Sequence, residues 1–504
     1  MSEATLAHAT DSKVRRVVIA GGGTAGWTAA AALSRLMGGL LDITLVESEE
    51  IGIVGVGEAT IPTIRTFHDL LGIPEAEFLR ETNGTFKLAI AFENWARDGD
   101  RYLHAFGEMG RSTWVAPFHH VWLQARAEGV AGPLTDHSLE AQAADAGRFQ
   151  TGDRFSLSYA YHFDATLYGK YLRKRSEAQG VKRIEGRIDS VAQDAETGFV
   201  TALKLASGQV VEGDLFIDCT GFRGLLIEET LKTGYDDWSH WLPTDTAVAC
   251  QTAPNGPLNP YTRAVAHDAG WRWRIPLQSR VGNGLVYCSR FLDDAAAKDR
   301  LVGLLDGPPI TEPRLIRYQT GRRKKTWNKN VVALGLSSGF IEPLESTSIH
   351  LFQIGISRLI QMFPYDGFNA PLEAHYNARI GREVEGVRDF VILHYHLNQR
   401  DEPFWRERRE AEIPDTLAER IGLFADSATA YQTAEDLFRV DSWAQVMIGQ
   451  RLEPKSWHRI GSLMPREQLY KVMQGMSNGI RSAVAAMPTQ AQFVAGYCGV
   501  RETA

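Results

Sequence analysis

The chain has 504 residues, 44% of them hydrophobic, and its 54 basic and 61 acidic residues give a formal net charge of −7. A chain of this length and composition buries a sizeable core, and neither sign of charge forms the long block expected of a nucleic-acid-binding protein or of a protein drawn to anionic membranes. The four cysteines, Cys219, Cys250, Cys288 and Cys498, lie far apart in the sequence. They indicate a reducing compartment and provide neither a disulfide framework nor a cysteine-based metal site.

The beginning of the chain carries no pattern of a targeting segment. Residues 1–12, which we expect to be a flexible N-terminus, hold no apolar core of signal-peptide length. No later run reaches the ~18 apolar residues that a membrane helix needs. We therefore expect a cytoplasmic protein without a membrane partner.

The first motif is a glycine-rich turn between a short strand and a helix. Residues 14–38 read VRRVVIAGGGTAGWTAAAALSRLMG, a β-branched run followed by glycines and an alanine-rich helix. Gly21, Gly23 and Gly26 have the spacing G-x-G-x-x-G, in which the backbone approaches a pyrophosphate and the helix N-terminus stabilises its charge. The next apolar strand, DITLVE, ends at Glu47, about 20 residues further on, where a carboxylate binds ribose hydroxyls. Together these features predict a dinucleotide site.

Two later segments indicate which dinucleotide binds. Residues 213–224, GDLFIDCTGFRG, and residues 330–347, NVVALGLSSGFIEPLEST, resemble the returning segments that hold FAD in two-domain oxidoreductases. A dehydrogenase that binds only NAD has less use for them. FAD is therefore favoured over NAD.

A lysine lies within an alternating strand predicted over residues 83–95, NGTFKLAIAFENW. The alternation places Lys87 on the same face as Ala89 and Ala91. Because these alanines leave space beside it, the amine faces either solvent or a cavity. In an apolar cavity, desolvation would lower its pKa and leave a usable amine.

Residues 270–276, GWRWRIP, predict a strand with two unlike faces. Trp271, Trp273 and Ile275 share one face, and Arg272 and Arg274 share the other. The indole-rich face is either ordinary β core or the wall of a site for a flat ring. The strand alone leaves both interpretations open.

A helix is predicted after the motif IEPLEST. Apolar residues recur at helical spacing from Ile349 to Leu359, so the helix begins near Ser346 or Thr347, either of which can cap it. Free amides at that start make a site for a small anion or for the electron-rich edge of a flavin. Glu345, directly before it, is either a charge that stabilises the helix dipole or a catalytic carboxylate.

Other motifs predict little chemistry. The histidine pairs in FHH (118–120) and HYH (394–396) have no evident third metal ligand, so we interpret them as surface or core residues and predict no metal site. The motifs GxSxG and HExxH are missing from the sequence, and so is a cysteine nucleophile elbow. Hydrolase chemistry is therefore not expected.

Taken together and in their order along the chain, these motifs closely resemble the flavin-dependent halogenases of the tryptophan halogenase type. The motifs are GGGTAGW (21–27), GVGEATIP (55–62), NGTFKLAIAFENW (83–95), GWRWRIP (270–276) and GFIEPLEST (339–347). The resemblance runs over most of residues 14–410. W-x-W-x-I-P is the signature of that family and favours the functional wall over ordinary core.

The resemblance implies a halogenation that consumes reduced FAD, O2 and a halide. A separate NAD(P)H-dependent flavin reductase would supply the reduced FAD, and hypohalous acid would form at the flavin. The oxidant would then move to Lys87, which holds or activates it, while Glu345 assists the lysine or accepts the ring proton. Trp271 and Trp273 would keep the aromatic substrate away from the flavin.

The resemblance also implies the binding residues. The residues expected to contact FAD are Gly21, Gly23, Thr24, Ala25, Gly26, Glu47, Ala59, Leu336 and Ile349. The backbone amides of Thr347 and Ser348 would bind the halide. Members of the tryptophan type commonly carry glycine at the position of Ser348, so the choice between chloride and bromide stays open.

The expected substrate is an electron-rich aromatic other than free tryptophan. Enzymes of this type that act on free tryptophan clasp it with an aromatic pair, a glutamate and a following Phe-Trp. Residues 429–449 keep Tyr431, place Leu437 at the glutamate and lack the Phe-Trp, so the ammonium group loses its carboxylate partner. His104 and Phe106 match the residues that sandwich an indole ring, which favours an indole-type substrate.

We thus expect an α/β fold with a Rossmann-type, flavin monooxygenase-like FAD domain, mixed β-sheets and a mainly helical C-terminal part. The FAD-binding core would span residues 13–350 discontinuously, with substrate-side sheet elements around 83–130 and 245–320, and residues 351–504 would cover the substrate site. The alternatives are an FAD-dependent aromatic monooxygenase and a non-catalytic flavin-binding protein. The association state, monomer or homodimer, stays open.

Overall fold

The computed structural model describes residues 13–50, 57–152 and 155–499. The expected flexible N-terminus, residues 1–12, and the first two residues of GVGEATIP lie outside the described residues.

The glycine motif lies on a six-stranded sheet with the order β20-β21-β12-β1-β2-β8. Its strands are β1 (Arg16–Ala20), β2 (Asp42–Glu47), β8 (Lys182–Glu185), β12 (Leu215–Asp218), β20 (Trp327–Asn328) and β21 (Val331–Ala333). All neighbours pair in parallel except β20, which is antiparallel to β21. This arrangement and the helix that follows β1 confirm the predicted Rossmann-type α/β fold.

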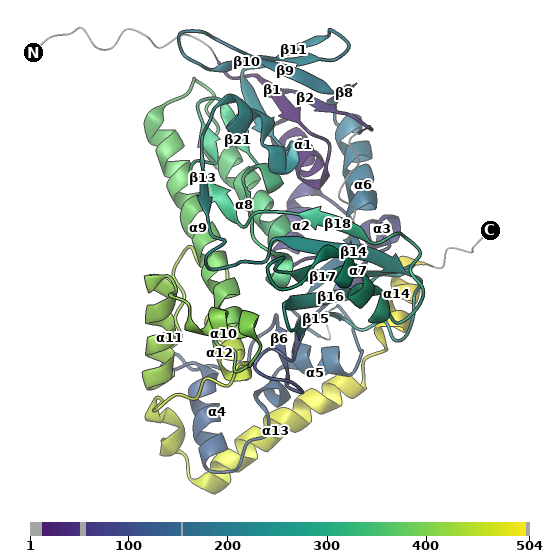
Figure 1. The fold of residues 1–504 in the computed structure, drawn as a ribbon. Coiled ribbons are helices and arrows are strands. Elements are labelled where there is room, and N and C mark those ends of the chain that lie inside the picture. Colours follow the sequence, from purple (N-terminus) through teal and green to yellow (C-terminus); the bar gives the residue numbers. More distant parts are fainter. Residues whose placement is uncertain (1–12, 51–56, 153–154, 500–504) are drawn as a thin grey trace, which may run out of the picture.

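Successive residues of β1 point into different layers, as the two-residue period of a strand requires. Val17 and Ile19 pack among the helices α1 (Thr24–Met37), α6 (Ala165–Ala178) and α8 (Ser348–Gln361). Val18 and Ala20 pack in a second cluster against a small sheet and a short π-helix. Those elements are β9 (Ile188–Gln193), β10 (Val200–Leu205), β11 (Val210–Glu212) and η3 (Leu225–Thr230). The sheet is therefore covered on both faces (Figure 1).

A seven-stranded sheet with the order β18-β14-β17-β16-β15-β5-β6 forms the second large layer. Its strands are β5 (Ala89–Glu93), β6 (Arg101–Ala105), β14 (Thr246–Thr252), β15 (Tyr261–His267), β16 (Gly270–Pro276), β17 (Val281–Tyr287) and β18 (Arg314–Arg317). Only β15 and β5 pair in parallel. The sheet is therefore mixed, as expected.

The single strand predicted over residues 83–95 is wrong, because two sheets share it. Its first part, β4 (Thr85–Lys87), belongs to the sheet β3-β7-β4 with β3 (Gly57–Ala59) and β7 (Ala160–Asp164). Its second part is β5. Between them the amide of Leu88 donates to the carbonyl of Pro260, directly before the first residue pair of β5 and β15, so the chain changes its partner strand at this residue. Lys87 consequently lies where the small sheet meets the seven-stranded sheet.

Short helices and a third small sheet fill the remaining N-terminal regions. They are α2 (Thr63–Leu71), α3 (Glu75–Glu81), α4 (Phe118–Ala127), η1 (Leu134–His137), α5 (Leu139–Asp145), η2 (Gly221–Arg223), β13 (Tyr235–Asp237), α7 (Asp294–Gly303), β19 (Gly321–Arg323), η4 (Gly335–Ser337), β22 (Gly339–Phe340) and η5 (Pro343–Glu345).

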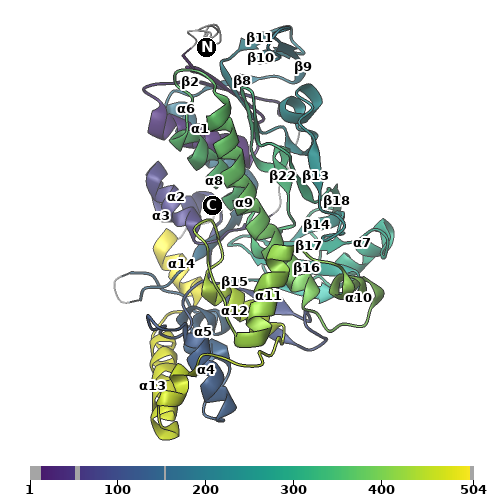
Figure 2. The same ribbon diagram turned by 90° about the vertical axis from the view of Figure 1, so that its left-hand side faces the viewer.

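Beyond Ser348 the named elements of the described chain are all helices. After α8 come α9 (Ala370–His396), α10 (Pro403–Glu410), α11 (Asp415–Ser427), α12 (Val440–Gly449), η6 (Arg459–Leu463), α13 (Arg466–Ala485) and α14 (Gln490–Cys498). Figure 2 shows α9 running from the six-stranded sheet down to α10, α11 and α12. Leu45 of β2, Leu359 of α8 and Met473 of α13 share one hydrophobic core, so the helices close over the sheets without a separate core of their own. The domain boundaries at residues 350 and 351 stay a prediction.

Within the described ranges, the structure contains no helix with both the length and the apolar character needed to cross a bilayer. The cytoplasmic location stays a prediction.

Candidate active site

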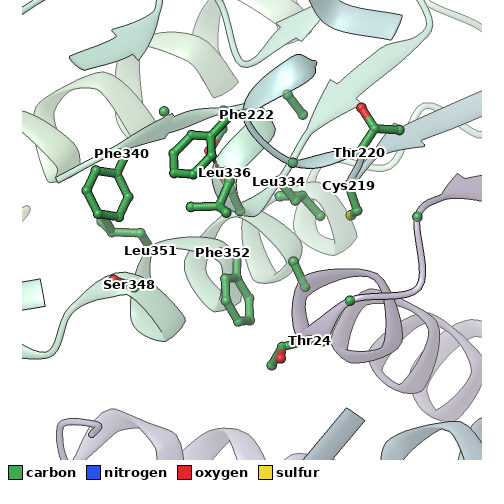
Figure 3. Close-up of a pocket in the computed structure, with 18 of the residues that line it drawn as sticks. Thr24, Cys219, Thr220, Phe222, Leu334, Leu336, Phe340, Ser348, Leu351 and Phe352 are labelled. Atoms are coloured by element: carbon green, nitrogen blue, oxygen red, sulfur yellow. Dashed lines mark hydrogen bonds between the residues drawn. The ribbon is translucent and has the colours of Figure 1, made fainter. Parts of the chain in front are cut away.

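A large cavity of about 1190 Å³ lies between the two main sheets and the helices α1, α8 and α9. Figure 3 shows Thr24 at the start of α1 and Ser348 at the start of α8, with Phe352 between them. The glycine turn after β1 closes one end. Residues of α9, including Tyr376 and Ile380, also line it, so the C-terminal part contributes to this cavity.

The glycine turn leaves the space a dinucleotide backbone needs. Gly21 has a φ of +106°, and a Cβ there would overlap the carbonyl of Cys219. A Cβ at Gly22 would overlap the Glu47 carboxylate, whereas Gly23 has open space around it. Gly26 lies behind the turn, where a Cβ would overlap the carbonyl of Gly21. Gly26 does not line the cavity. Its missing side chain instead allows α1 to pack closely against the turn, which is the usual role of the third glycine of this motif.

The other residues expected to contact FAD do line the cavity. They are Gly21, Gly23, Thr24, Ala25, Glu47, Ala59, Leu336 and Ile349. The Glu47 carboxylate is held in place because Arg183 donates to its Oε1 over 2.6 Å and Trp27 donates to its Oε2 over 3.3 Å. A cradle that a side chain would fill, next to a fixed carboxylate, fits the diphosphate and ribose of a dinucleotide.

The tryptophan strand forms one wall of this cavity. In β16 the predicted alternation is confirmed: Trp271, Trp273 and Ile275 are buried and line the cavity, while Arg272 and Arg274 lie half-buried on the other face. The Trp273 ring has room because Gly284 lies opposite it in β17, where a Cβ would overlap the indole.

Lys87 is completely buried, which resolves the choice between solvent and interior. Its Nζ donates to the carbonyl of Thr60 over 3.0 Å and to Oγ of Ser346 over 2.7 Å, and it lies 5.0 Å from the centroid of the Phe106 ring. Burial lowers the pKa of Lys87 to about 7, although the nearby charge of Glu345 opposes this shift. Ser346 also lines the cavity, so one hydroxyl separates the amine from the cofactor region.

Glu345 is buried and held between two histidines. Its Oε2 lies 2.8 Å from Nδ1 of His104, and its Oε1 lies 2.9 Å from Nε2 of His394. Burial alone would raise the pKa of this carboxyl, but His104 and His394 outweigh burial and lower it to about 2. Glu345 is therefore an ionised carboxylate near Lys87.

The helix after Glu345 begins where it was predicted, beside Ser346 and Thr347. Helix α8 starts at Ser348, and Ser346 has a left-handed φ of +59° that ends the preceding turn. Thr347 occupies the N-cap position, but its side chain makes no capping bond, and its buried Oγ1 has no partner among the described residues. Of the two residues expected at the halide, Ser348 lines the cavity and Thr347 lies buried behind it.

His104 lies in β6, and Phe106 directly follows the end of this strand at Ala105. The amide of Gln445 in α12 clamps the residue between them, accepting from Ala105 N over 2.8 Å and donating to Ala105 O over 3.2 Å. The Phe438 ring lies 6.2 Å from that of His104. Tyr431, the one tyrosine kept from the tryptophan-binding pattern, instead lies over the guanidinium of Arg420.

Sequence reasoning missed His394, Ser346, Thr60 and Glu342. The motif HYH was considered, but no sequence signal places the end of α9 beside a residue about fifty positions earlier. Thr60 lies inside the motif GVGEATIP and Ser346 inside GFIEPLEST, but nothing in either motif indicates that both residues accept hydrogen bonds from Lys87. Across the described residues no group of three histidine, cysteine or acidic side chains has the arrangement of a metal site.

Comparison with known proteins gives consistent matches. The family model described as tryptophan halogenase matches residues 16–466. The chain is 36% identical over 449 residues to the tryptophan 7-halogenase RebH of Lentzea aerocolonigenes, covering 84% of each chain. Among solved structures, the flavin-dependent halogenase Xcc4156 from Xanthomonas campestris has a TM-score of 0.96 at 50% identity, covering 98% of this chain and 100% of that chain. BrvH, a flavin-dependent halogenase from Brevundimonas sp. BAL3, has a TM-score of 0.92 at 43% identity, covering 97% of this chain and 100% of that chain.

These matches extend over both main sheets and most of the helical part, and they agree with the dinucleotide cradle and the tryptophan wall. The family uses FAD in its reduced form and a halide. The chain therefore belongs to the tryptophan halogenase family and is a flavin-dependent halogenase.

Proposed function

We propose that this enzyme halogenates a neutral, electron-rich, indole-type aromatic at a centre formed by Lys87, Glu345 and Phe106. The observation that carries the proposal is the fully buried Lys87 amine, bonded to the hydroxyl of Ser346 at the boundary of the cofactor cavity. A lysine in this position costs folding free energy, so its retention in an apolar site favours a chemical role.

In this proposal the oxidant forms in the large cavity, where FAD would bind. The turn at Gly21–Gly23 and the start of α1 would bind the FAD diphosphate, and Glu47 would bind the ribose. Bound reduced FAD, delivered by a separate NAD(P)H-dependent reductase, supplies with O2 the oxidising power that converts halide into an electrophilic halogen. The amides of Thr347 and Ser348 at the start of α8 would bind the halide. Trp271 and Trp273 would separate the aromatic substrate from the flavin.

Lys87 then holds the electrophilic halogen. With a pKa of about 7, the amine exists in both protonation states near neutral pH, so it offers either an N–H donor or a lone pair. Thr60 and Ser346 fix its nitrogen from two directions. The Phe106 ring, 5.0 Å from Nζ, offers a flat surface on which an aromatic substrate stacks close to the amine.

Glu345 acts as the base that takes the proton from the halogenated ring. Its low pKa keeps it ionised at neutral pH, His104 fixes its Oε2 by a hydrogen bond, and His394 lies 2.9 Å from its Oε1. Leu437, at the position expected for the tryptophan-binding glutamate, leaves a substrate ammonium group without its carboxylate partner, which favours a neutral substrate over free tryptophan.

The test supplies the purified enzyme with FAD, a flavin reductase, NADH, O2 and bromide, and compares indole with tryptophan as substrates. Mass spectrometry should detect brominated indole by its isotope doublet, with a much lower yield from tryptophan. Equal rates for both would refute the substrate assignment. An oxygenated product that forms without halide would favour a monooxygenase, and FAD binding with no product from any electron-rich arene would refute the proposed activity.

A further inference from the structure

A second buried glutamate lies three residues before Glu345 and has no role in the chemistry described so far. Glu342 has no solvent exposure. Its Oε2 accepts three hydrogen bonds, from Trp271 Nε1 over 2.8 Å, from the Tyr395 hydroxyl over 2.8 Å and from Thr244 Oγ1 over 3.2 Å. Its Oε1 is buried and has no partner among the described residues.

These three bonds join parts of the chain that are far apart in sequence. Trp271 belongs to β16 in the cavity wall, Tyr395 lies in the last turn of α9, and Thr244 precedes β14. The residues on either side of Glu342, Ile341 and Pro343, line the cavity. Glu342 itself does not line the cavity. Its hydrogen bonds instead hold the adjacent part of the cavity wall in place.

The anchored segment leads directly into the reacting centre. Residues Pro343–Glu345 form the short helix η5, and Ser346 follows with its left-handed backbone. Within four residues of Glu342 the chain thus places Glu345 between two histidines and Ser346 against Lys87. A shift of the turn at Glu342 would move both contacts together.

We propose that Glu342 is a positioning residue, whose hydrogen bonds to Trp271, Tyr395 and Thr244 fix the turn that holds Glu345 and Ser346 against Lys87. This inference rests on the proposed function of Lys87. The two carboxyls of the turn differ in charge behaviour: burial raises the pKa of Glu342 to about 7 despite its three donors, whereas the histidines lower that of Glu345. Because Trp271, Tyr395 and Thr244 all donate to its Oε2, Glu342 serves as a hydrogen-bond acceptor, and an amide oxygen can replace it in this role.

The experiment compares Glu342→Met, which removes the acceptor, with Glu342→Gln, which keeps one. For each variant we would measure kcat and KM for indole bromination, FAD affinity, the melting temperature and the fraction of oxidised halogen that escapes to a dimedone-type trap. Glu342→Met should lower kcat by about tenfold to a hundredfold, as expected for a misplaced reacting group, and should raise the escaping fraction. KM and FAD affinity should change little, and Glu342→Gln should restore most of kcat.

Tyr395→Phe keeps the proposal testable if Glu342→Met does not fold. It should lower kcat less than Glu342→Met does, in the same direction, and combining the two substitutions should cost no more than Glu342→Met alone because they remove a shared bond. Glu75→Met is the matched control, because Glu75 Oε2 likewise accepts from two tyrosine hydroxyls, those of Tyr159 and Tyr161. It should lower the melting temperature without changing kcat or the escaping fraction.

A readout without turnover separates this inference from the proposed function. The NMR signal of 13Cε-labelled Lys87 in the enzyme without cofactor should move in Glu342→Met and Tyr395→Phe, but not in Glu75→Met. If the wild type makes no product, the proposed function fails, while a moved signal still supports the positioning role. An unmoved signal, or a kcat loss that Glu342→Gln does not restore, would overturn it.

Discussion

The cofactor region and the Lys87 centre are built in opposite ways. The cofactor region is formed largely by residues close together in the sequence, the glycines after β1 and the glutamate that ends the next strand. It depends on the space that glycines leave because they have no side chain. The Lys87 centre depends on charged and polar side chains that come together from distant segments, with a sequence separation of 259 between Lys87 and Ser346 and of 241 between His104 and Glu345. A site that depends on the space beside glycines can be predicted from a short motif. A site formed by side chains from distant segments can be recognised only in the folded structure.

The two regions also differ in electrostatics. In the cofactor region Glu47 is neutralised by Arg183, a conventional ion pair. In the centre the burial of Lys87 lowers its pKa to about 7, and the histidines lower that of Glu345 to about 2. Substitutions should therefore separate cofactor binding from halogen transfer, and the following predictions test that separation.

The largest effect is expected for Lys87→Met. Without the amine, the electrophilic halogen has no holder, so halogenation of indole should fall by about a thousandfold. Oxidation of reduced FAD should continue at the wild-type rate because the cavity is unchanged. Product analysis beside O2 consumption checks this, and Lys204→Met, which removes an exposed strand lysine, is the control that should stay fully active. Halogenation by Lys87→Met at the wild-type rate would remove Lys87 from the mechanism.

The same substitution should change how stability depends on pH. The pKa of Lys87 is about 7 in the folded protein against an ordinary 10.5, so the unfolded chain binds one more proton between these values. The burial cost is therefore complete below pH 7 and is lost as the pH rises toward 10.5. Lys87→Met should be more stable than the wild type at pH 7 by as much as about 5 kcal/mol.

Urea unfolding at pH 7 and pH 10 measures this difference for both proteins. The advantage of Lys87→Met should shrink strongly at pH 10. An advantage of equal size at both pH values would show that Lys87 has no lowered pKa.

Glu345→Gln should reduce kcat by about a hundredfold, because it removes the base for the ring proton. FAD affinity should not change, since Glu345 does not line the cavity. Rates with ring-deuterated indole provide a further check: loss of the base should make proton removal slower and raise the isotope effect. A variant with normal kcat would contradict the assigned role.

The smallest effect belongs to the cofactor region. Gly22→Ala places a Cβ where the Glu47 carboxylate lies, whereas a Cβ at the exposed Gly39, outside the cavity, meets open space. We expect Gly22→Ala to weaken FAD binding by about tenfold, a loss of roughly 1.4 kcal/mol. Fluorescence titration with FAD measures both variants, and Gly39→Ala serves as the control for the effect of a methyl group on a glycine that does not contact the cofactor. Equal affinities for the two variants would show that the turn tolerates side chains and would weaken the contrast between the regions.

The parts of the fold predicted correctly from sequence are those with a local physical cause. Strand β1, the glycine turn and the end of β2 at Glu47 follow from burial patterns and backbone sterics within about thirty residues. The two faces of β16 follow from the two-residue period of a strand.

The errors have long-range causes. The strand predicted over residues 83–95 divides because its first part pairs with β7 and its second part with β15, and no local pattern indicates either partner. His394 lies beside Glu345 only because of how α9 packs. The sequence gives no sign of this contact, so the histidines of HYH were interpreted as surface or core residues.

The most direct test of the central claim is the titration of Lys87 itself. The lysines would be labelled with 13C at Cε, the Lys87 resonance assigned by its loss in Lys87→Met, and its shift followed with pH in the enzyme without cofactor. A buried amine held by Thr60 and Ser346 should titrate near pH 7. Titration near pH 10.5, the value of an exposed lysine, would contradict the account.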